Sequence, residues 1–391
     1  MKILFSARPA YGHVYPLLPL AVAARRAGHQ VSFATTGSFL ATLDRLGFPT
    51  HSVGVTIEDA RKELLAALSA DAMPKGADGR PYVENLGRLF LDVVAPRTAA
   101  DLSPLLARLQ PDLVVYEQYE FGAAVAAHVA GIAAVCHALS PRLPDEVLRA
   151  MAADRVDRLW ADHGGAASMF DVFTGDAYLD IFPKALQQPA ILAHPARVPM
   201  RPIPFAEPEA ILPAWVRECD RPLVYLTLGT IVATDKVLRP VIAGLATLDV
   251  DVLLALGSAD GAALGPLPRN VHVESFVDQP TVLRHADLAV HHGGSGTILG
   301  SLTYGTPQLL LPQGTDQFWN ADRMAGAGLA EVLEPPQVTP DAVAHAAAVE
   351  LGNYRRAVDA VSAEIAALPH PSDVLEQLVA RIGRRSDASA A

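Results

Sequence analysis

The sequence lacks the features of a disulfide-stabilised, zinc-bound or nucleic-acid-binding protein. Its 391 residues include only two cysteines, Cys136 and Cys219, which are too far apart for a disulfide framework or a zinc motif. Acidic residues outnumber basic ones by 42 to 31, and a formal net charge of −11 argues against a surface that neutralises nucleic-acid phosphates or anionic lipids. Any bound phosphate must therefore be held locally, by backbone amides and helix ends.

No uninterrupted apolar run has the length and composition of an export signal or a membrane span. The N-terminal apolar stretch is broken by an arginine, a glycine, a histidine and two prolines, unlike the core of a signal peptide. Residues 121–139 approach the length of a bilayer, but two histidines and a glycine interrupt them, so a helix followed by a buried strand is the better interpretation. We expect a cytoplasmic protein with neither a membrane nor a nucleic-acid partner.

Hydrophobic residues make up 51% of the chain, enough for a large core divided between two domains. Apolar runs and helical periodicity alternate in the first half, which is typical of a parallel, doubly wound sheet. The expected strands are residues 2–6, 30–34, 112–116 and 132–137, and the expected helices are residues 17–26 and 121–130. Between these two βαβ units, residues 73–81 are rich in turn formers and predict a mobile surface loop.

Prolines recur from residue 183 to residue 222 and predict an extended connector, because proline disfavours helix interiors and central strands. The α/β alternation then resumes. The expected strands are residues 223–228, 250–256, 271–274, 288–291 and 307–311, and residues 237–245 are an expected helix. Two such α/β halves would face each other across a cleft, the usual place for a ligand.

A glycine-rich turn in residues 287–300 (DLAVHHGGSGTILG) follows an apolar strand and leads into an apolar helix. Glycines let backbone amides approach an anion closely, and the helix N-terminus adds partial positive charge. The candidate donors are His292, Gly293, Gly294, Ser295, Gly296 and Thr297. A glycine turn that merely allows close packing is the simpler alternative, but the histidine, the hydroxyls and the strand-to-helix context favour a phosphate site. A dinucleotide-binding loop is disfavoured, because the spacing is GxGxxxG and no acidic residue follows a second strand about twenty residues later.

The order and spacing of these residues carry a resemblance to a known family. His292, Gly294 and Thr297, followed by Gly305, Pro307, Pro312, Asp316 and Gln317, are similar to the donor-binding signature of family 1 (UDP-glycosyltransferase-like) enzymes of the GT-B fold. The likeness extends to residues 276–279 (FVDQ), 226–230 (LTLGT) and 12–21 (GHVYPLLPLA), and so covers both halves. Within the family, the chain most resembles bacterial enzymes that glycosylate polyketides and other antibiotics, including enediynes.

The resemblance implies a domain organisation. We expect an N-terminal acceptor-binding domain at residues 1–195, a proline-rich linker at 196–221, and a C-terminal nucleotide-sugar-binding domain at 222–370. A C-terminal helix and tail, residues 371–391, would pack back on the first domain. Residues 53–97 would line the acceptor pocket, with Tyr82, Leu86 and Phe90 as candidate walls, although apolar residues at helical spacing are equally typical of a core.

By the same resemblance, Phe276 would stack on the pyrimidine, the backbone of Val277 would read its edge, and Gln279 would belong to the same donor site. Thr230 would bind the diphosphate, and Asp316 and Gln317 would bind the hydroxyls of the sugar. Phe276, Thr230 and the Asp-Gln pair each have a simpler alternative. Phe276 could be a core aromatic, Thr230 a helix cap, and the Asp-Gln pair a helix start.

One departure bears on the donor. UDP-using plant relatives commonly carry a glutamate three residues after the Ser/Thr of this loop, where it binds ribose hydroxyls. Gly300 stands there in this chain. The missing carboxylate removes a reason to prefer ribose, so a dTDP-deoxysugar is favoured over a UDP-sugar.

His13 is the candidate general base. It lies in the loop after the first strand, at the carboxyl end of a parallel sheet, where active sites of such folds lie, and it matches the catalytic histidine of the family. An unperturbed histidine, with a pKa of about 6.5, is largely neutral at cellular pH and can accept the proton of an acceptor hydroxyl. A loop histidine that caps the following helix is the alternative.

A carboxylate that orients the imidazole would complete the pair. The family usually has an aspartate just after the strand that reads PDLVVYE here, and Glu117 occupies that position. Glutamate is one methylene longer, so Glu120 is the second candidate and a solvated loop carboxylate the alternative.

The implied reaction is displacement with inversion at the anomeric carbon. No DxD-like pair follows an apolar strand in the C-terminal half, so no metal or other cofactor is expected. The expected partners are a small-molecule acceptor and a dTDP- or UDP-sugar, and a homodimer is left open. The competing interpretations are a nucleotide-sugar 2-epimerase of the same fold, a non-catalytic relative that binds nucleotide or acceptor, and, more remotely, a nicotinamide-dependent oxidoreductase.

Overall fold

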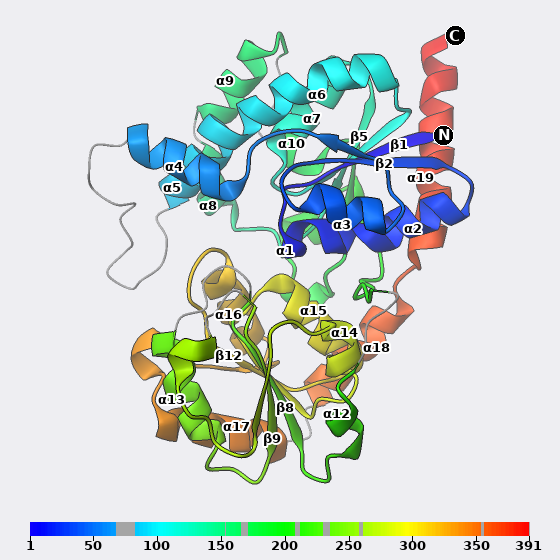
Figure 1. Ribbon diagram of the computed structural model, residues 1–391. Coiled ribbons are helices and arrows are strands. Elements are labelled where there is room, and N and C mark those ends of the chain that lie inside the picture. The colour runs from blue at the N-terminus through cyan, green and yellow to red at the C-terminus, as the bar shows by residue number, and fades with distance from the viewer. Residues whose placement is uncertain are drawn as a thin grey trace. The chain divides into compact units, whose positions relative to one another are not determined.

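The chain divides into two compact units, the first Met1–Arg201 with Leu368–Ala391 and the second Pro202–Ala367 (Figure 1). The computed structural model describes residues 1–67, 83–152, 154–165, 171–207, 212–229, 235–257, 261–352 and 356–390. The expected loop at 73–81, Tyr82 and Thr230 lie outside these residues. The expected linker, 196–221, contributes strand β7 (Arg197–Pro199) to the first unit and helix α12 (Ala214–Glu218) to the second.

The first unit is built on a seven-stranded parallel sheet with the order β3-β2-β1-β4-β5-β6-β7. Its strands are β1 (Lys2–Ser6), β2 (Gln30–Thr35), β3 (Thr50–Ser52), β4 (Leu113–Glu117), β5 (Ala133–His137), β6 (Ala177–Asp180) and β7. Every residue of β4 is buried, as expected of a central parallel strand covered by helices on both faces.

Helices cover both faces of this sheet, with α2 and α3 on one side and α6 and α7 on the other in Figure 1. The helices of the first unit are α1 (Tyr11–Val14), α2 (Leu18–Arg26), α3 (Phe39–Arg45), α4 (Ile57–Ala67), α5 (Val83–Gly87), α6 (Ala95–Leu109), α7 (Phe121–Val129), α8 (Asp145–Ala152), α9 (Arg155–Asp162), α10 (Asp171–Thr174), α11 (Pro189–Leu192) and α19 (Pro371–Ala390). Short 3₁₀ turns occupy Tyr15–Leu17 and Lys184–Leu186, and Arg88–Val94 is a π-helix. The C-terminal helix α19 packs against α2, so both chain ends belong to this unit.

The second unit repeats the architecture with a six-stranded parallel sheet in the order β10-β9-β8-β11-β12-β13. Its strands are β8 (Leu223–Thr227), β9 (Asp251–Ala255), β10 (Val271–Glu274), β11 (Leu288–His291), β12 (Gln308–Leu310) and β13 (Glu331–Val332). Its helices are α12, α13 (Asp235–Leu245), α14 (Gln279–Leu283), α15 (Ser295–Tyr304), α16 (Gln317–Gly326), α17 (Pro340–Gly352) and α18 (Arg356–Ala367), with 3₁₀ turns at Gly261–Leu264 and Pro335–Gln337. One core forms between the sheet, α13 and α17, and another between the sheet, α12 and α14.

The expected strands match the observed ones to within one or two residues, because most of them are apolar runs bounded by turn residues. The missed strands are β3, β6, β7 and β13. Three of them have only two or three residues and their sequences, THS, RVP and EV, carry no apolar pattern. These three segments are strands because each pairs through backbone hydrogen bonds with the edge of a longer neighbouring strand.

Within the described residues, no helix combines the length and apolar character needed to cross a membrane. The same part of the chain has no group of three or more His, Cys, Asp or Glu side chains arranged to hold a metal ion.

Candidate active site

Both sheets place their candidate residues where the strand order reverses. In the first unit β1 lies between β2 and β4. The segment that follows β1 carries His13, and Glu117 is the last residue of β4. In the second unit β8 lies between β9 and β11, and the loop that leaves β11 carries the glycine-rich turn. Loops at such a reversal point diverge to opposite faces of the sheet and leave a crevice, which is where doubly wound folds bind ligands.

His13 lies in the short helix α1 and contacts the end of β4. Its Nδ1 is 2.9 Å from Oε1 of Glu117. The imidazole is 25% exposed, whereas the carboxylate is completely buried. With the Nδ1 proton donated to Glu117, Nε2 is left as the basic atom, which is the arrangement that a general base requires. The structure thus brings His13 together with Glu117.

Glu117 is held as a carboxylate by several donors. Oε1 accepts a hydrogen bond from Nε of Arg8 at 2.8 Å, and Oε2 accepts one from the backbone amide of Tyr119 at 2.7 Å. Burial by itself would raise the pKa of Glu117, but the charges of Arg8 and His13 and these hydrogen bonds outweigh it and lower the pKa to about 2. The glutamate side chain therefore reaches His13, although it is one methylene longer than the aspartate that the resemblance led us to expect there.

Arg8 is a part of this cluster that the sequence interpretation missed. It is 2% exposed, and its Nη2 lies 3.4 Å from Nδ1 of His13. Its guanidinium lies over the ring of Phe90, 4.1 Å from the ring centroid. Phe90, a candidate acceptor wall, belongs to the π-helix, a rare geometry that is frequent at functional sites. Leu86, the other described candidate wall, is half-buried in α5.

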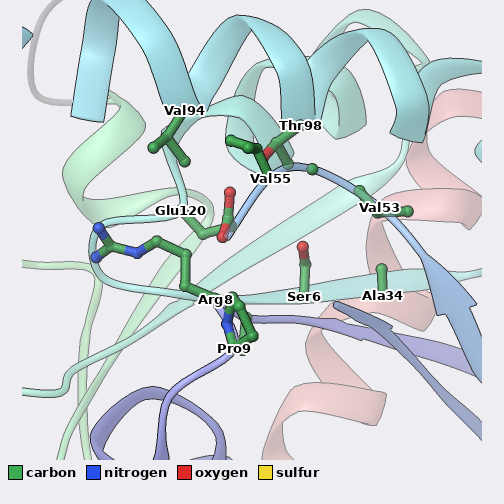
Figure 2. Close-up of a pocket in the computed structure, with 11 residues that line it drawn as sticks. Ser6, Arg8, Pro9, Ala34, Val53, Val55, Val94, Thr98 and Glu120 are labelled. Atoms are coloured by element: carbon green, nitrogen blue, oxygen red, sulfur yellow. The ribbon is translucent and has the colours of Figure 1, made fainter. Parts of the chain in front are cut away.

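Glu120 forms no hydrogen bond with His13 and instead lines a small cavity together with Arg8 (Figure 2). The cavity has room for about one water molecule. It is lined by Ser6, Ala7, Arg8, Pro9, Ala34, Val53, Gly54, Val55, Val94, Thr98 and Glu120. Burial, followed by the negative charge of Glu117, raises the pKa of Glu120 to about 7, although Arg8 and a hydrogen bond with Thr98 act in the opposite direction.

In the second unit, β11 passes through Gly293 into helix α15. Gly293 has a φ of +85°, a conformation that favours glycine, and Gly294 is the N-cap residue of the helix. The amides of Thr297 and Ile298 already donate to the carbonyl of Gly294. The earlier amides of the first turn have no partner within the helix and are suited to an anion.

Two residues that the sequence interpretation missed hold this loop. His291 accepts a hydrogen bond at Nδ1 from the amide of Gly293 (3.1 Å), so its Nε2 donates to Oε1 of Gln308 (3.0 Å). Nδ2 of Asn320 lies 3.0 Å from the carbonyl of Gly293, 3.1 Å from Oγ of Ser295 and 3.2 Å from a carboxylate oxygen of Asp316. The only sequence signals for these roles were a second histidine beside His292 and an asparagine one helical turn after Asp316.

His292 packs beside two glycines. A Cβ atom on Gly294 would lie 2.5 Å from its Nε2, and one on Gly229 would lie 2.7 Å from its Cε1. Burial lowers the pKa of His292 to about 4, against the opposing effects of Asp316 and the Thr227 backbone. The ring is therefore neutral and has a single N–H. It hydrogen-bonds the Thr227 backbone, and its buried Nδ1 has no hydrogen-bond partner among the described residues.

The remaining donor-site candidates lie around the same loop. Gln279, at the start of α14, donates through Nε2 to Oγ1 of Thr297 at 3.0 Å. Phe276 is 54% exposed, which excludes the alternative of a core aromatic, whereas Val277 packs partly into the core. Gly300 is buried, and a Cβ there would lie 2.8 Å from Cδ1 of Leu283.

Asp316 and Gln317 form the start of α16, as the simpler interpretation also expected. Oε1 of Gln317 accepts hydrogen bonds from the amides of Gln313 (2.8 Å) and Gly314 (3.1 Å), so this side chain shapes its own loop. The preceding Thr315 has a φ of +51°, which is strained for a β-branched residue and typical of functional loops.

Comparison with known proteins assigns the family. The N-terminal domain of the erythromycin biosynthesis protein CIII-like family matches residues 22–229, and its C-terminal domain matches residues 239–381. L-demethylnoviosyl transferase of Streptomyces niveus is 30% identical, covering 97% of this chain and 98% of the relative. TDP-daunosamine transferase DnrS of Streptomyces peucetius is 31% identical, covering 97% of each chain.

The crystal structure of the glycosyltransferase VinC in complex with dTDP is similar over 98% of this chain and 100% of VinC, with a TM-score of 0.78 and 27% identity. The predicted fold class, two parallel-sheet α/β domains of the GT-B type, is confirmed. The chain belongs to the erythromycin biosynthesis protein CIII-like family and is a family 1 glycosyltransferase of the GT-B fold, of the natural-product type.

Proposed function

We propose that the protein transfers a deoxysugar from a dTDP donor to a hydroxyl group of a small-molecule natural product in the cytoplasm, with inversion at the anomeric carbon. The observation that carries the proposal is the contact between Nδ1 of His13 and the buried, ionised Glu117. A carboxylate in this position fixes the imidazole tautomer and stabilises the imidazolium that forms when Nε2 takes a proton.

In the proposed reaction, Nε2 of His13 removes the proton of the acceptor hydroxyl as its oxygen attacks the anomeric carbon. The bond between that carbon and the diphosphate oxygen breaks on the opposite face, and the leaving dTDP takes the electron pair. Negative charge that develops on the diphosphate meets His292 and the amides at the start of α15. Because these groups stabilise the charge of the diphosphate without a cation, the proposal includes no metal ion.

A dTDP donor is supported by three observations. Gly300 stands where a ribose-binding carboxylate would stand. DnrS is named for TDP-daunosamine, and VinC was crystallised with dTDP. In this proposal the exposed Phe276 stacks on the base and Val277 reads its edge. Thr230 binds the diphosphate, and Asp316 and Gln317, at the start of α16, bind the sugar.

The test is the variant His13→Ala, compared with the wild type for turnover and for dTDP binding by calorimetry. General-base catalysis contributes about 10²–10⁴-fold, so turnover of a panel of dTDP-sugars with hydroxylated aglycones should fall by that factor. Affinity for dTDP should stay within about twofold, since His13 belongs to the other unit from the donor loop. Undiminished turnover would exclude His13 as the base, and tighter binding of UDP than of dTDP would exclude the preference for deoxyribose.

A further inference from the structure

The carboxyl group of Glu120 is buried beside the proposed base and has no part in the reaction as described. The residue is 3% exposed, and its Oε1 has no hydrogen-bond partner among the described residues. Its amide donates to the carbonyl of Glu117 at 2.8 Å, so the two carboxyl groups leave the end of β4 on one tight turn. A buried polar atom without a partner is costly and calls for a functional or structural reason.

The surroundings of Glu120 contain very few charges. Arg8 faces it from the loop after β1, and Glu117 lies at the end of its own strand. Thr98 approaches from α6, and the cavity wall contributed by the segment after β3 is the apolar pair Val53 and Val55 (Figure 2). Within the described residues, one guanidinium is therefore shared by two buried carboxyl groups.

Arg8 connects this cavity to the His13–Glu117 pair. Its Nε donates to Glu117 and its Nη2 lies near His13, while its Nη1 is buried without a hydrogen-bond partner among the described residues. A charge change at Glu120 therefore acts on the His13–Glu117 pair in two ways, directly through the charge of Glu117 and through the side chain of Arg8.

The charge of the cluster changes when His13 becomes an imidazolium. With Glu120 neutral, the positive charges on Arg8 and His13 face the single negative charge on Glu117, which leaves a net charge of +1. With Glu120 ionised, the same cluster sums to zero. An uncompensated charge in a poorly hydrated site is costly, so the ionised form of Glu120 stabilises the protonated base.

We propose that Glu120 is a positioning residue of the transfer reaction, whose ionised carboxylate supplies the second negative charge that neutralises the cluster when His13 holds the acceptor proton. The inference rests on the proposed role of His13 as base. Glu120 loses its own proton to solvent before the reaction and does not exchange protons with the substrates. The raised pKa of Glu120, about 7, agrees with this geometry and places the change at neutral pH.

The test compares wild type and Glu120→Gln for the release of dTDP from dTDP-glucose, with alizarin or water as acceptor, between pH 6 and pH 8.5. Glutamine keeps the shape and cannot ionise. We expect wild type and variant to differ by less than about twofold at pH 6 and by about tenfold at pH 8.5, with the KM for dTDP-glucose unchanged. A ratio that stays constant across this range, at any value, would overturn the proposal, because a merely structural role has no such pH dependence.

A matched control is Glu350→Gln in the second unit. Glu350 is also completely buried, and its Oε1 accepts a hydrogen bond from the amide of Glu331. This variant introduces the same chemical change away from the cluster, so its ratio to wild type should not depend on pH.

If Glu120→Gln fails to fold, infrared titration of the ¹³C-glutamate-labelled wild type decides instead. A protonated carboxyl band should persist at pH 6 and disappear as the pH rises through about 7, whereas its absence at pH 6 would overturn the inference.

The result for His13→Ala separates the two proposals. Unchanged turnover in His13→Ala removes the base itself, whereas a loss there combined with a pH-independent Glu120→Gln ratio removes only this inference.

Discussion

The two units have similar sheets but place opposite chemistry at the point where the strand order reverses. In the first unit the end of β4 and the loops after β1 and β4 bury a cluster of formal charges, Arg8, Glu117 and Glu120, around a histidine. In the second unit the loop after β11 is held by neutral groups, and burial lowers the pKa values of His291 and His292 to about 3 and about 4. The same architecture thus supports one site that is rich in buried charges and another whose buried histidines are neutral.

The difference follows from what each site has to do. A base that gains a proton needs a compensating charge nearby, so the first unit carries ionised groups in a buried place. A site for a diphosphate needs hydrogen-bond donors that are already oriented toward the anion. The second unit supplies such a site with backbone amides, a neutral imidazole and a helix N-terminus. Substitutions that remove a charge should therefore act on turnover in the first unit, and substitutions that alter shape should act on donor affinity in the second.

The largest effect should come from removing the charge of Glu117. Glu117→Gln leaves Arg8 without its carboxylate and the imidazolium without its partner, so we expect turnover to fall by about 10²–10³-fold with dTDP affinity unchanged. Steady-state kinetics and calorimetry on the same preparation would measure both. Glu350→Gln is the control for the effect of a buried amide. If Glu117→Gln also lost dTDP affinity, the assignment of catalysis to the first unit and of donor binding to the second would be contradicted.

The next effect tests shape in the second unit. Gly294→Ala would place a Cβ 2.5 Å from Nε2 of His292, whereas a Cβ on Gly296 meets nothing within 4 Å. We expect Gly294→Ala to weaken dTDP binding about tenfold to a hundredfold, because the ring or the loop must shift. Gly296→Ala is the matched control in the same loop and should bind dTDP within about threefold of wild type. Equal losses in both variants would show that loop flexibility, and not the position of His292, determines affinity.

A smaller effect is expected for Asn320→Ala, which removes the hydrogen bonds to Gly293, Ser295 and Asp316. Loss of a buried side-chain donor costs about 1–3 kcal/mol, so dTDP affinity should fall about tenfold and the free energy of unfolding by a comparable amount. Calorimetry and urea denaturation would measure these. Asn320→Asp, which keeps the shape but replaces the donor by an acceptor, should not rescue binding, and a rescue would mean that the hydrogen bonds are unimportant.

The smallest effect concerns stability and has opposite signs for the two glutamates. The pKa of Glu117 is lowered to about 2, so its stabilising contribution is present above the ordinary pKa of about 4.5 and is lost as pH falls through about 2. The pKa of Glu120 is raised to about 7, so its contribution is present below about 4.5 and is lost as pH rises to about 7.

Glu120→Gln should therefore gain stability relative to wild type, on the order of 1 kcal/mol, between pH 5 and pH 8. Urea denaturation of both proteins at the two pH values measures this difference. A constant difference between the two proteins would show that Glu120 is ionised throughout this range.

Local sequence determined most of the strands and the positions of several site residues along them. Strands such as β1, β8 and β11 are nearly continuous apolar runs with turn residues at their ends, and the glycine-rich loop requires a conformation that residue type alone predicts. His13 and the glycine loop could therefore be placed at the carboxyl ends of strands without a structure, because position along a strand is a property of the chain itself.

Only the tertiary structure decided which groups meet. The choice between Glu117 and Glu120 as partner of His13 depends on the pairing of β1 with β4, which joins residues about a hundred positions apart. The positions of Arg8, His291 and Asn320 likewise follow from contacts between separate elements, which local propensity does not encode. Residue type and order determined the elements and their ends, whereas strand order and burial determined the charges, because electrostatic interactions depend on distance in space and not on distance along the chain.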